Sequence, residues 1–193
     1  MGDGKLSLSF RLLNKLGLIN NVERYGTITI LGMLKLGVVT FFRRIIFTYA
    51  YKAYIFEPVY KKRLRPVIWR WLGCDIGKNV HIGHEVRLDF GNAERIHVGD
   101  NVVISNGVTI LCHKRDVSGY KEGEKATQLP FIYDDVVLET GCQIGLNATI
   151  LPGVTIGKGA IIGSCALVTR NIPAWSIAAG SPAKVIKSVV KDT

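Results

Sequence analysis

The stretch IGLNATILPGVTIGKGAIIG, residues 144–163, places an isoleucine at every sixth position and follows three of the four with a glycine. Neither ordinary period explains this pattern, because a helix repeats near 3.6 residues and a strand near 2. A six-residue repeat is typical of a short strand and a turn that recur around a coil. The stretch therefore predicts a parallel β-helix of hexapeptide repeats.

The same phase extends from Ile76 to Val168, and a second register of Val or Ala lies four residues after most of its members. Three strands would make one turn of a triangular prism, with coils stacked about 4.8 Å apart. Each aliphatic side chain would then lie on its copy in the next coil. The predicted inward positions are Ile76, Ile82, Leu88, Val98, Ile104, Ile110, Ile132, Leu138, Ile144, Ile150, Ile156, Ile162 and Val168.

Two insertions interrupt the predicted prism. Four extra residues fall between Leu88 and Val98, and sixteen fall between Ile110 and Ile132. Counted from Ile76, both insertions lie at the same corner in adjacent coils. Loops on a rigid scaffold commonly carry function, so this corner is the predicted site.

The positive charge is concentrated in the N-terminal part of the chain. The 193 residues carry a net charge of +10, and residues 1–75 hold 13 Lys and Arg against 4 Asp and Glu. The four cysteines, Cys74, Cys112, Cys142 and Cys165, form no CxxC pair, which favours a reduced, cytoplasmic setting. Cys142 and Cys165 fall where the repeat takes small residues and are predicted to fill the core.

Residues 1–75 are predicted to form a basic, aromatic-rich helical extension. Residues 27–60 are apolar and aromatic, but Lys and Arg leave no uncharged run of about 18 residues, which argues against a spanning helix. An amphipathic helical pair is expected, continuing through residues 61–73 with cations beside Trp69 and Trp71. Two interpretations remain open. The extension packs on its own or a neighbouring subunit, or it lies on an anionic membrane surface, as a peripheral protein of the inner face of the cytoplasmic membrane. No motif indicates a nucleic-acid partner.

Residues 76–187 resemble the hexapeptide-repeat acyltransferases, and most closely the O-acetyltransferases of sugars and polysaccharides. The motifs that carry this resemblance are VGDNVVISNGVTI (98–110), ILPGVTIGKGAIIG (150–163), VTRNIPAWSIAAGSPAKVIK (168–187) and a histidine just before the long insertion. The resemblance implies a mainly β domain, residues 76–193, folded as a left-handed parallel β-helix. It also implies a homotrimer with active sites between prisms, acetyl-CoA as the donor and no metal.

In the family, a histidine removes the proton of the acceptor hydroxyl, which then attacks the acetyl-CoA thioester directly. By position in LCHKRD this histidine is His113. Many relatives carry the active histidine two places later, where this chain has Arg115, and a guanidinium cannot act as a base. His97, which ends the first insertion at the same corner, is the reserve candidate. His81 and His84 are expected at the surface or in subunit contacts.

The remaining candidate residues concern the acceptor and the donor. Asp89, one coil beneath His113, is expected to orient the imidazole or to bind sugar hydroxyls, as is Asp116. The loop 114–131 is predicted to form an acceptor-side flap on which Tyr120 and Phe131 stack on a sugar ring, and Asn92 is a weaker acceptor-binding candidate. The resemblance implies that the donor contacts Gly145, Gly163, Ser164, Arg170, Lys184 and Lys187.

The sequence therefore predicts an acetyltransferase that moves acetyl from acetyl-CoA to a hydroxyl of a sugar, glycan or lipid-linked saccharide. A small-molecule acetyltransferase acting on an antibiotic or a free sugar is the first alternative. A non-catalytic trimeric β-helix scaffold is the second. The four histidines also match a zinc-dependent relative with this fold, but their spacing does not require a metal.

Overall fold

The structure is a computed structural model that describes residues 6–15, 26–52 and 64–189. The chain divides into two compact units, Met1–Ile46 and Phe47–Thr193, and each is described by itself. The cations Lys61, Lys62 and Arg63 of the predicted basic segment lie outside the described residues.

The first unit contains α1 (Leu8–Lys15) and the start of α3 (Ile30–Lys52). Hydroxyl side chains cap both helices: the Phe10 N–H donates to Ser7 Oγ at 3.1 Å, and the Gly32 N–H donates to Thr29 Oγ1 at 3.2 Å. α3 is one helix across most of the stretch in which a helical pair was predicted. The end of that stretch lies outside the described residues.

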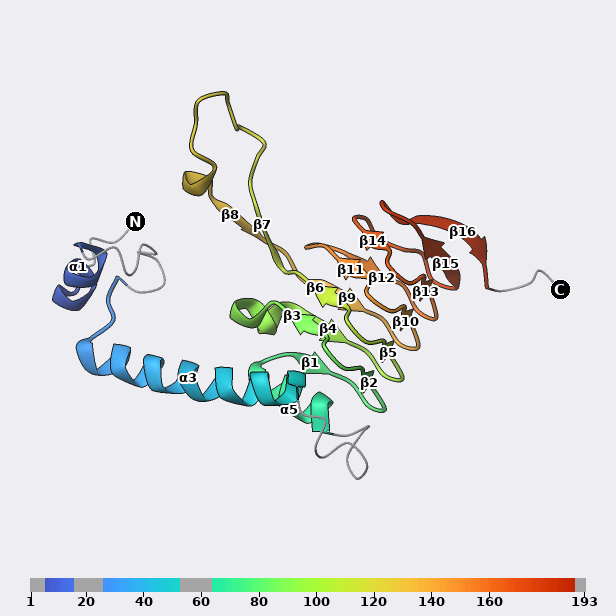
Figure 1. Ribbon diagram of the computed structural model, residues 1–193, viewed down its shortest axis with the longest axis horizontal. Helices are drawn as coiled ribbons and strands as arrows, with labels where there is room; N and C mark the ends of the chain where they lie inside the picture. Colours follow the sequence, from blue (N-terminus) through green and yellow to red (C-terminus); the bar gives the residue numbers. More distant parts are fainter. Residues whose placement is uncertain (1–5, 16–25, 53–63, 190–193) are drawn as a thin grey trace. The chain divides into compact units, whose positions relative to one another are not determined.

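Three parallel sheets form the faces of a left-handed β-helix in the second unit (Figure 1). Face A consists of β1 (Asp75–Ile76), β4 (Ile96–Val98), β9 (Val136–Leu138) and β12 (Thr155–Ile156). Face B consists of β2 (His81–Ile82), β5 (Val103–Ile104), β10 (Gln143–Ile144), β13 (Ile161–Ile162) and β15 (Ser176–Ala179). Face C consists of β3 (Arg87–Leu88), β6 (Thr109–Ile110), β11 (Thr149–Ile150) and β14 (Leu167–Val168).

The core is the column of hexad side chains inside the prism. Every predicted aliphatic position except Ile132 is buried, and strand register places Ile82 beside Ile104 and Ile144 beside Ile162. The second register, which begins with Val80, is buried as well. Asparagines such as Asn79 and Asn101 occupy left-handed corner positions, with φ of 54° and 57°, which their short polar side chains tolerate.

The assignment of Ile132 to the prism is wrong. Ile132 lies in β8 (Phe131–Tyr133), which pairs antiparallel with β7 (His113–Arg115) and places Ile132 opposite Lys114. Face A resumes at Leu138, which pairs with Val98 and Ile156. The long insertion is therefore one hexad longer than predicted, and every later repeat lies one face earlier than predicted: Leu138 lies on face A and Ile144 on face B.

Both insertions lie at the corner between faces C and A, as predicted. The first is η1 (Phe90–Arg95), between β3 and β4. The second lies between β6 and β9 and forms the β7–β8 hairpin, with η2 (Ala126–Gln128) near its tip. The hairpin projects from the prism in Figure 1.

Both ends of the β-helix are covered. At the first coil, α5 (Leu64–Leu72) buries Trp69 and Leu72, and Arg70 donates from Nε to the Ile76 carbonyl at 3.0 Å and from Nη2 to the Gly77 carbonyl at 2.6 Å. At the last coil, β16 (Lys184–Ser188) pairs antiparallel with β15. These elements pair with or cover strand edges that could otherwise bind further strands.

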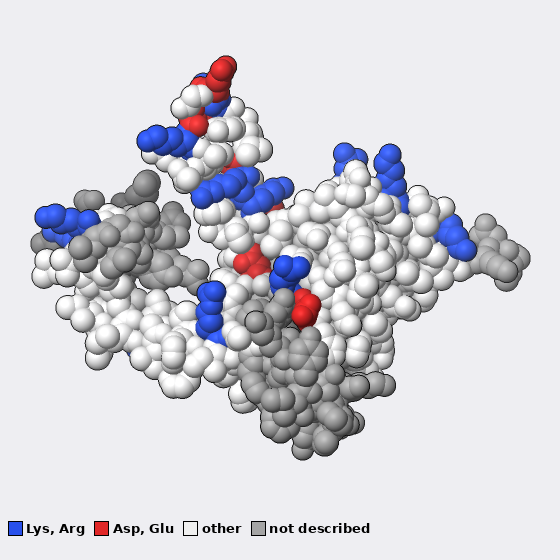
Figure 2. All heavy atoms as spheres, in the orientation of Figure 1, with Lys and Arg blue, Asp and Glu red and all other residues white. Residues whose placement is uncertain are grey.

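Between the hairpin and the last coils, the face in Figure 2 carries few charged side chains.

Two cysteine predictions have different outcomes. Cys142 is buried in the core, as predicted. The prediction for Cys165 is wrong, because Cys165 is exposed at a corner with φ of 59°, and the neighbouring Ala166 takes the inward position.

Coil stacking makes Gly145 sensitive to substitution. A Cβ at Gly145 would lie 2.6 Å from Ser164 N and 2.6 Å from Ile162 O in the next coil. We expect Gly145→Ala to lower the free energy of unfolding by about 1–3 kcal/mol, because backbone must move to admit the methyl group. Thermal unfolding at fixed protein concentration measures this. Gly119→Ala, where nothing lies within 4 Å, is the control; equal stability of the two variants would contradict the argument.

Candidate active site

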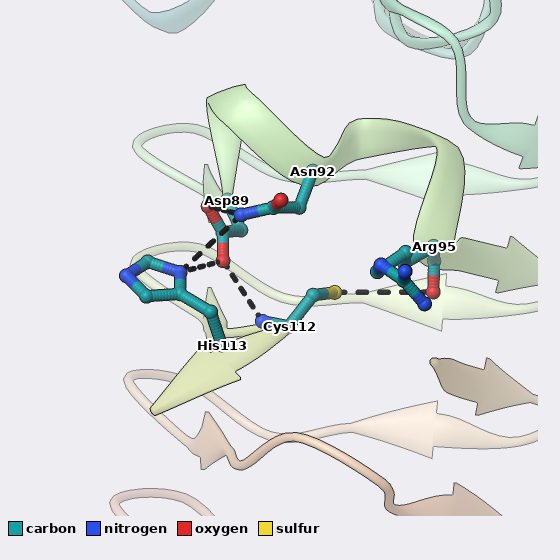
Figure 3. Close-up of polar contacts among 5 residues, drawn as sticks. All are labelled: Asp89, Asn92, Arg95, Cys112 and His113. Atoms are coloured by element: carbon teal, nitrogen blue, oxygen red, sulfur yellow. Dashed lines mark hydrogen bonds and ion pairs between the residues drawn. The ribbon is translucent and has the colours of Figure 1, made fainter. Parts of the chain in front are cut away.

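The centre of the corner is a pair formed by Asp89 and His113. Asp89 follows β3 and His113 follows Cys112 after β6, so coil stacking brings the two side chains together. His113 Nδ1 bonds Asp89 Oδ2 (Figure 3). The side chain of His113 is 36% exposed and that of Asp89 is 6% exposed. The carboxylate is therefore a buried partner of a reachable imidazole.

Two further groups hold the Asp89 carboxylate in place. The Cys112 N–H donates to Oδ2 at 3.0 Å, and Asn92 Nδ2 donates to Oδ1 at 2.9 Å. Asn92 lies in η1, the first insertion, and its Nδ2 is 3.4 Å from His113 Nδ1. Both oxygens of the Asp89 carboxylate therefore take part in hydrogen bonds. Asp89, held by Asn92 and the Cys112 N–H, in turn fixes the orientation of the His113 ring.

These contacts fix the tautomer of His113. A carboxylate only accepts hydrogen bonds, so Nδ1 carries the proton and Nε2 keeps its lone pair when the ring is neutral. The second ring nitrogen points away from Asp89 and Asn92 in Figure 3. The arrangement can accept a proton from a hydroxyl or amine at Nε2 while the buried carboxylate stabilises the resulting imidazolium.

The neighbouring Cys112 is unsuited to be a nucleophile. Burial, and then the negative charge of Asp89, raise the pKa of the Cys112 thiol to about 12. Its Sγ lies 3.8 Å from the Arg95 carbonyl oxygen. Because a thiolate is the reactive form, this cysteine stays an inert thiol near neutral pH.

Two aromatic rings of β8 lie beside His113. The Phe131 ring centroid is 5.2 Å from that of His113 at an interplanar angle of 72°, and the Tyr133 centroid is 6.2 Å away at 33°. Sequence reasoning named Phe131 but missed Tyr133 and Arg95, whose guanidinium carbon lies 5.8 Å from the Tyr133 centroid. The alternation of Phe131 and Tyr133 was the available signal, since residues two apart share one side of a strand.

The other predicted hairpin residues lie farther along it. The Asp116 carboxylate accepts the Ser118 N–H at 3.0 Å, and this bond holds the pKa of Asp116 below its ordinary value. The Tyr120 hydroxyl donates to the Glu124 carbonyl at 3.2 Å in the loop between β7 and η2. Asp116 and Tyr120 therefore bond within the hairpin, and it is Asp89 that contacts the imidazole.

The remaining histidines occupy other faces. His97, the reserve candidate, lies on face A with its ring nitrogens 3.7 Å from Asp75 Oδ2 and 3.7 Å from Asp135 Oδ2. His84 Nδ1 accepts from Arg65 Nη2 at 2.9 Å, and His81 lies on face B. Among the described residues, no group of three or more His, Cys, Asp and Glu side chains is arranged to hold a metal ion.

The predicted donor residues lie at two corners of the prism and on β16. Gly145, Gly163 and Ser164 follow β10 and β13, at the corner between faces B and C, so one chain does not bring them to His113. Arg170 follows β14 and lies at the His113 corner, two coils farther on. Lys184 and Lys187 are exposed on β16.

Family models match both halves of the prism. The model described as "Bacterial transferase hexapeptide (six repeats)" matches residues 135–170, and "Hexapeptide repeat of succinyl-transferase" matches residues 73–112. The repeats of this chain are therefore of the hexapeptide-repeat transferase type. Both matches lie within the β-helix described above.

Relatives with curated names share only part of their length with this chain. It is 33% identical over 137 residues to the "Putative acetyltransferase C18B11.09c" of Schizosaccharomyces pombe, covering 68% of this chain and 63% of the relative. It is 53% identical over 60 residues to the 2,3,4,5-tetrahydropyridine-2,6-dicarboxylate N-acetyltransferase of Staphylococcus aureus, covering 30% and 25%. The chain thus spans less than two thirds of either relative.

Solved structures share the fold. A maltose O-acetyltransferase from Clostridium difficile 630 superposes with a TM-score of 0.58 at 23% identity, over 78% of this chain and 86% of that one. A hexapeptide-repeat acetyltransferase from Vibrio cholerae, complexed with acetyl-CoA, gives 0.55 at 17% identity, over 77% and 86%.

Removing the buried carboxylate should destabilise the corner. In Asp89→Ala the Cys112 N–H loses its acceptor in a buried position, so the free energy of unfolding should fall by about 1–3 kcal/mol. Urea unfolding measures the loss. Asp116→Ala removes a carboxylate that bonds within its own turn and should change stability by less than about 0.5 kcal/mol. An equal effect of the two substitutions would show that Asp89 does not support the corner.

Proposed function

We propose that the protein is an acetyl-CoA-dependent acetyltransferase whose acceptor is a hydroxyl of a sugar, a glycan or a lipid-linked saccharide. The observation that carries the proposal is the Asp89–His113 pair on a hexapeptide β-helix, with Nε2 directed away from its buried partners. The acetyltransferase names of relatives and the maltose O-acetyltransferase fold support the same class.

In the proposed reaction His113 acts as general base. Nε2 takes the proton of the acceptor hydroxyl as its oxygen attacks the carbonyl carbon of the thioester. The C–S bond then breaks, the acetyl group stays on the acceptor oxygen, and the proton passes from His113 to the departing thiolate. Asp89 stabilises the imidazolium between these steps, as a carboxylate does beside the histidine of a catalytic triad. Direct transfer suits a corner whose neighbouring thiol, Cys112, stays protonated.

A cyclic homotrimer would complete this site. His113 lies at one corner of the prism, and Gly145, Gly163 and Ser164 lie at another, so a neighbouring prism is the natural source of the donor surface. Arg170, Lys184 and Lys187 are the proposed partners of the donor phosphates, because cations form strong hydrogen bonds with phosphate oxygens. The fold also explains why Gly145 and Gly163 are glycines, because a Cβ at either position would lie against backbone or a Cβ of the next coil.

Transfer to an amine is the second candidate. The relative with 53% identity over 60 residues is an N-acetyltransferase, and a neutral imidazole can also remove a proton from an attacking amine. A small molecule such as a free sugar or an antibiotic is an acceptor in the same scheme. The acceptor panel in the following experiment therefore contains sugars, amino sugars and aminoglycosides.

The proposed function is tested by comparing acetyl transfer by the His113→Ala variant with that by the wild-type protein. Loss of a positioned base should lower kcat by about 10²–10⁴-fold, while the dissociation constant of acetyl-CoA, from calorimetry, stays the same. Release of the CoA thiol from acetyl-CoA measures turnover. His97→Ala, which removes a histidine outside the Asp89 pair, is the matched control. Near-wild-type turnover by His113→Ala would show that His113 is not the general base. Loss of turnover in His97→Ala alone would assign that role to His97.

We propose in addition that the first unit holds the protein at an anionic membrane surface. α3 exposes apolar side chains on several sides, and residues 26–52 contain Lys and Arg but no Asp or Glu. None of the helices in the described part of the chain combines the length and apolar character that a membrane span requires. The exposed apolar residues of α3 are Ile30, Leu31, Leu34, Leu36, Val38, Val39, Phe41, Phe42 and Ile45.

Membrane attachment of this kind depends on charge and on salt. Each cation near an anionic surface contributes about 1 kcal/mol, so Arg43→Gln with Arg44→Gln should weaken partitioning about 30-fold. Binding should also weaken as salt rises. Co-sedimentation with phosphatidylserine-containing vesicles measures it. Lys121→Gln with Lys125→Gln makes the same charge change on the hairpin and is the control. If wild-type protein stays in the supernatant, the membrane proposal fails, and the first unit instead packs on its own or a neighbouring subunit.

A further inference from the structure

Arg115 follows His113 by two residues on β7, and its side chain makes its contacts within the hairpin. The guanidinium carbon lies 4.1 Å from the Phe131 ring centroid. Nη1 donates to the Thr127 carbonyl at 3.1 Å and to the Leu129 carbonyl. Arg115 therefore ties the returning strand of the hairpin to the outgoing one and supports the face of Phe131.

Phe131 and Tyr133 form an aromatic wall beside His113. Their ring centroids are 6.1 Å apart, and the residues are 42% and 43% exposed, so each ring keeps a large free surface. Arg95, which is paired with Asp135 at 2.9 Å, lies over Tyr133. A guanidinium thus supports the wall at each end, and His113 lies alongside both rings.

We propose that the aromatic wall is the acceptor subsite, that it binds the C–H face of a sugar ring, and that Arg115 is its positioning residue. This inference rests on the proposed function. The face of an aromatic ring is negative, so it attracts the slightly positive C–H groups on one face of a pyranose. The ring hydroxyls at the edge of the sugar remain free, and one of them can reach the Nε2 of His113.

The polar groups around the wall are held in place by contacts of their own. The carboxylate oxygens of Asp89 are occupied by Asn92, Cys112 and His113. Nη1 of Arg95 donates to Asp135, and Nη1 of Arg115 donates to hairpin carbonyls. What the wall presents to a ligand is apolar ring surface, and that surface suits a saccharide.

The experiment measures KM and kcat for methyl glycosides of glucose, galactose, mannose and N-acetylglucosamine, with acetyl-CoA as donor. Phe131→Leu and Tyr133→Leu should each raise the glycoside KM about 3- to 10-fold, the value of an aromatic contact, and leave the acetyl-CoA KM unchanged. Phe131→Tyr, which keeps a ring, should retain the wild-type KM. Arg115→Lys keeps the charge but loses the planar stack, so it should raise the glycoside KM without lowering kcat.

Val117→Ala is the matched control, because Val117 is an exposed apolar residue of the same hairpin with no assigned role in acceptor binding. An unchanged glycoside KM in Phe131→Leu and Tyr133→Leu would overturn the subsite. A change in the acetyl-CoA KM alone would assign the wall to the donor.

If wild-type protein acetylates neither these glycosides nor the sugars, amino sugars and aminoglycosides of the wider acceptor panel, the proposed function fails and the wall is tested by binding alone. Saturation-transfer NMR of the methyl glycosides against His113→Ala, with and without Phe131→Leu, then decides. Glycoside binding that Phe131→Leu abolishes and Val117→Ala retains supports the wall, and absence of glycoside binding overturns it.

Discussion

The structure depends on the stacking of one aliphatic side chain on its copy in the next coil. A strand of two residues makes too few hydrogen bonds to be stable alone, so each strand depends on its neighbours in the sheet and on the buried column behind it. Such short strands also accumulate little twist, and the usual preference for right-handed crossovers, which arises from strand twist, has little influence here. The inward register is the constraint that every insertion must respect.

That constraint explains why the candidate site lies at a corner. An insertion within a strand would displace all later side chains from the column, whereas one between faces leaves the register intact. Both insertions of this chain lie between faces C and A in adjacent coils. Asp89 and His113, which begin these insertions, are therefore held one coil apart by the pairing of β3 with β6. The Asp89–His113 contact follows from coil spacing alone.

Much of the fold was predictable because the aliphatic residues recur at every sixth position of the sequence. The prism, the buried second register and the corner that bears both insertions follow from counting hexads. Ile132 misled the count because it is aliphatic and sits one hexad before Leu138, yet antiparallel pairing with β7 removes it from the core. The inward position was predicted for Cys165 but belongs to the next residue, Ala166. Small residues are common both at the exposed corners and at the neighbouring inward positions, so residue size does not distinguish the two.

The site was predictable to the extent that coil register creates it. His113 and Asp89 are placed by the prism: the family resemblance indicated His113, and the coil count placed Asp89 one coil beneath it. Tyr133, Arg95 and the contacts of Arg115 depend on how a long hairpin folds back, and no repeat encodes that. The proposed base and its carboxylate thus belong to the scaffold, and the aromatic wall belongs to the insertion. Because the hairpin can change without disturbing the hexad column, the proposed function lets the choice of acceptor vary independently of the chemistry performed on it.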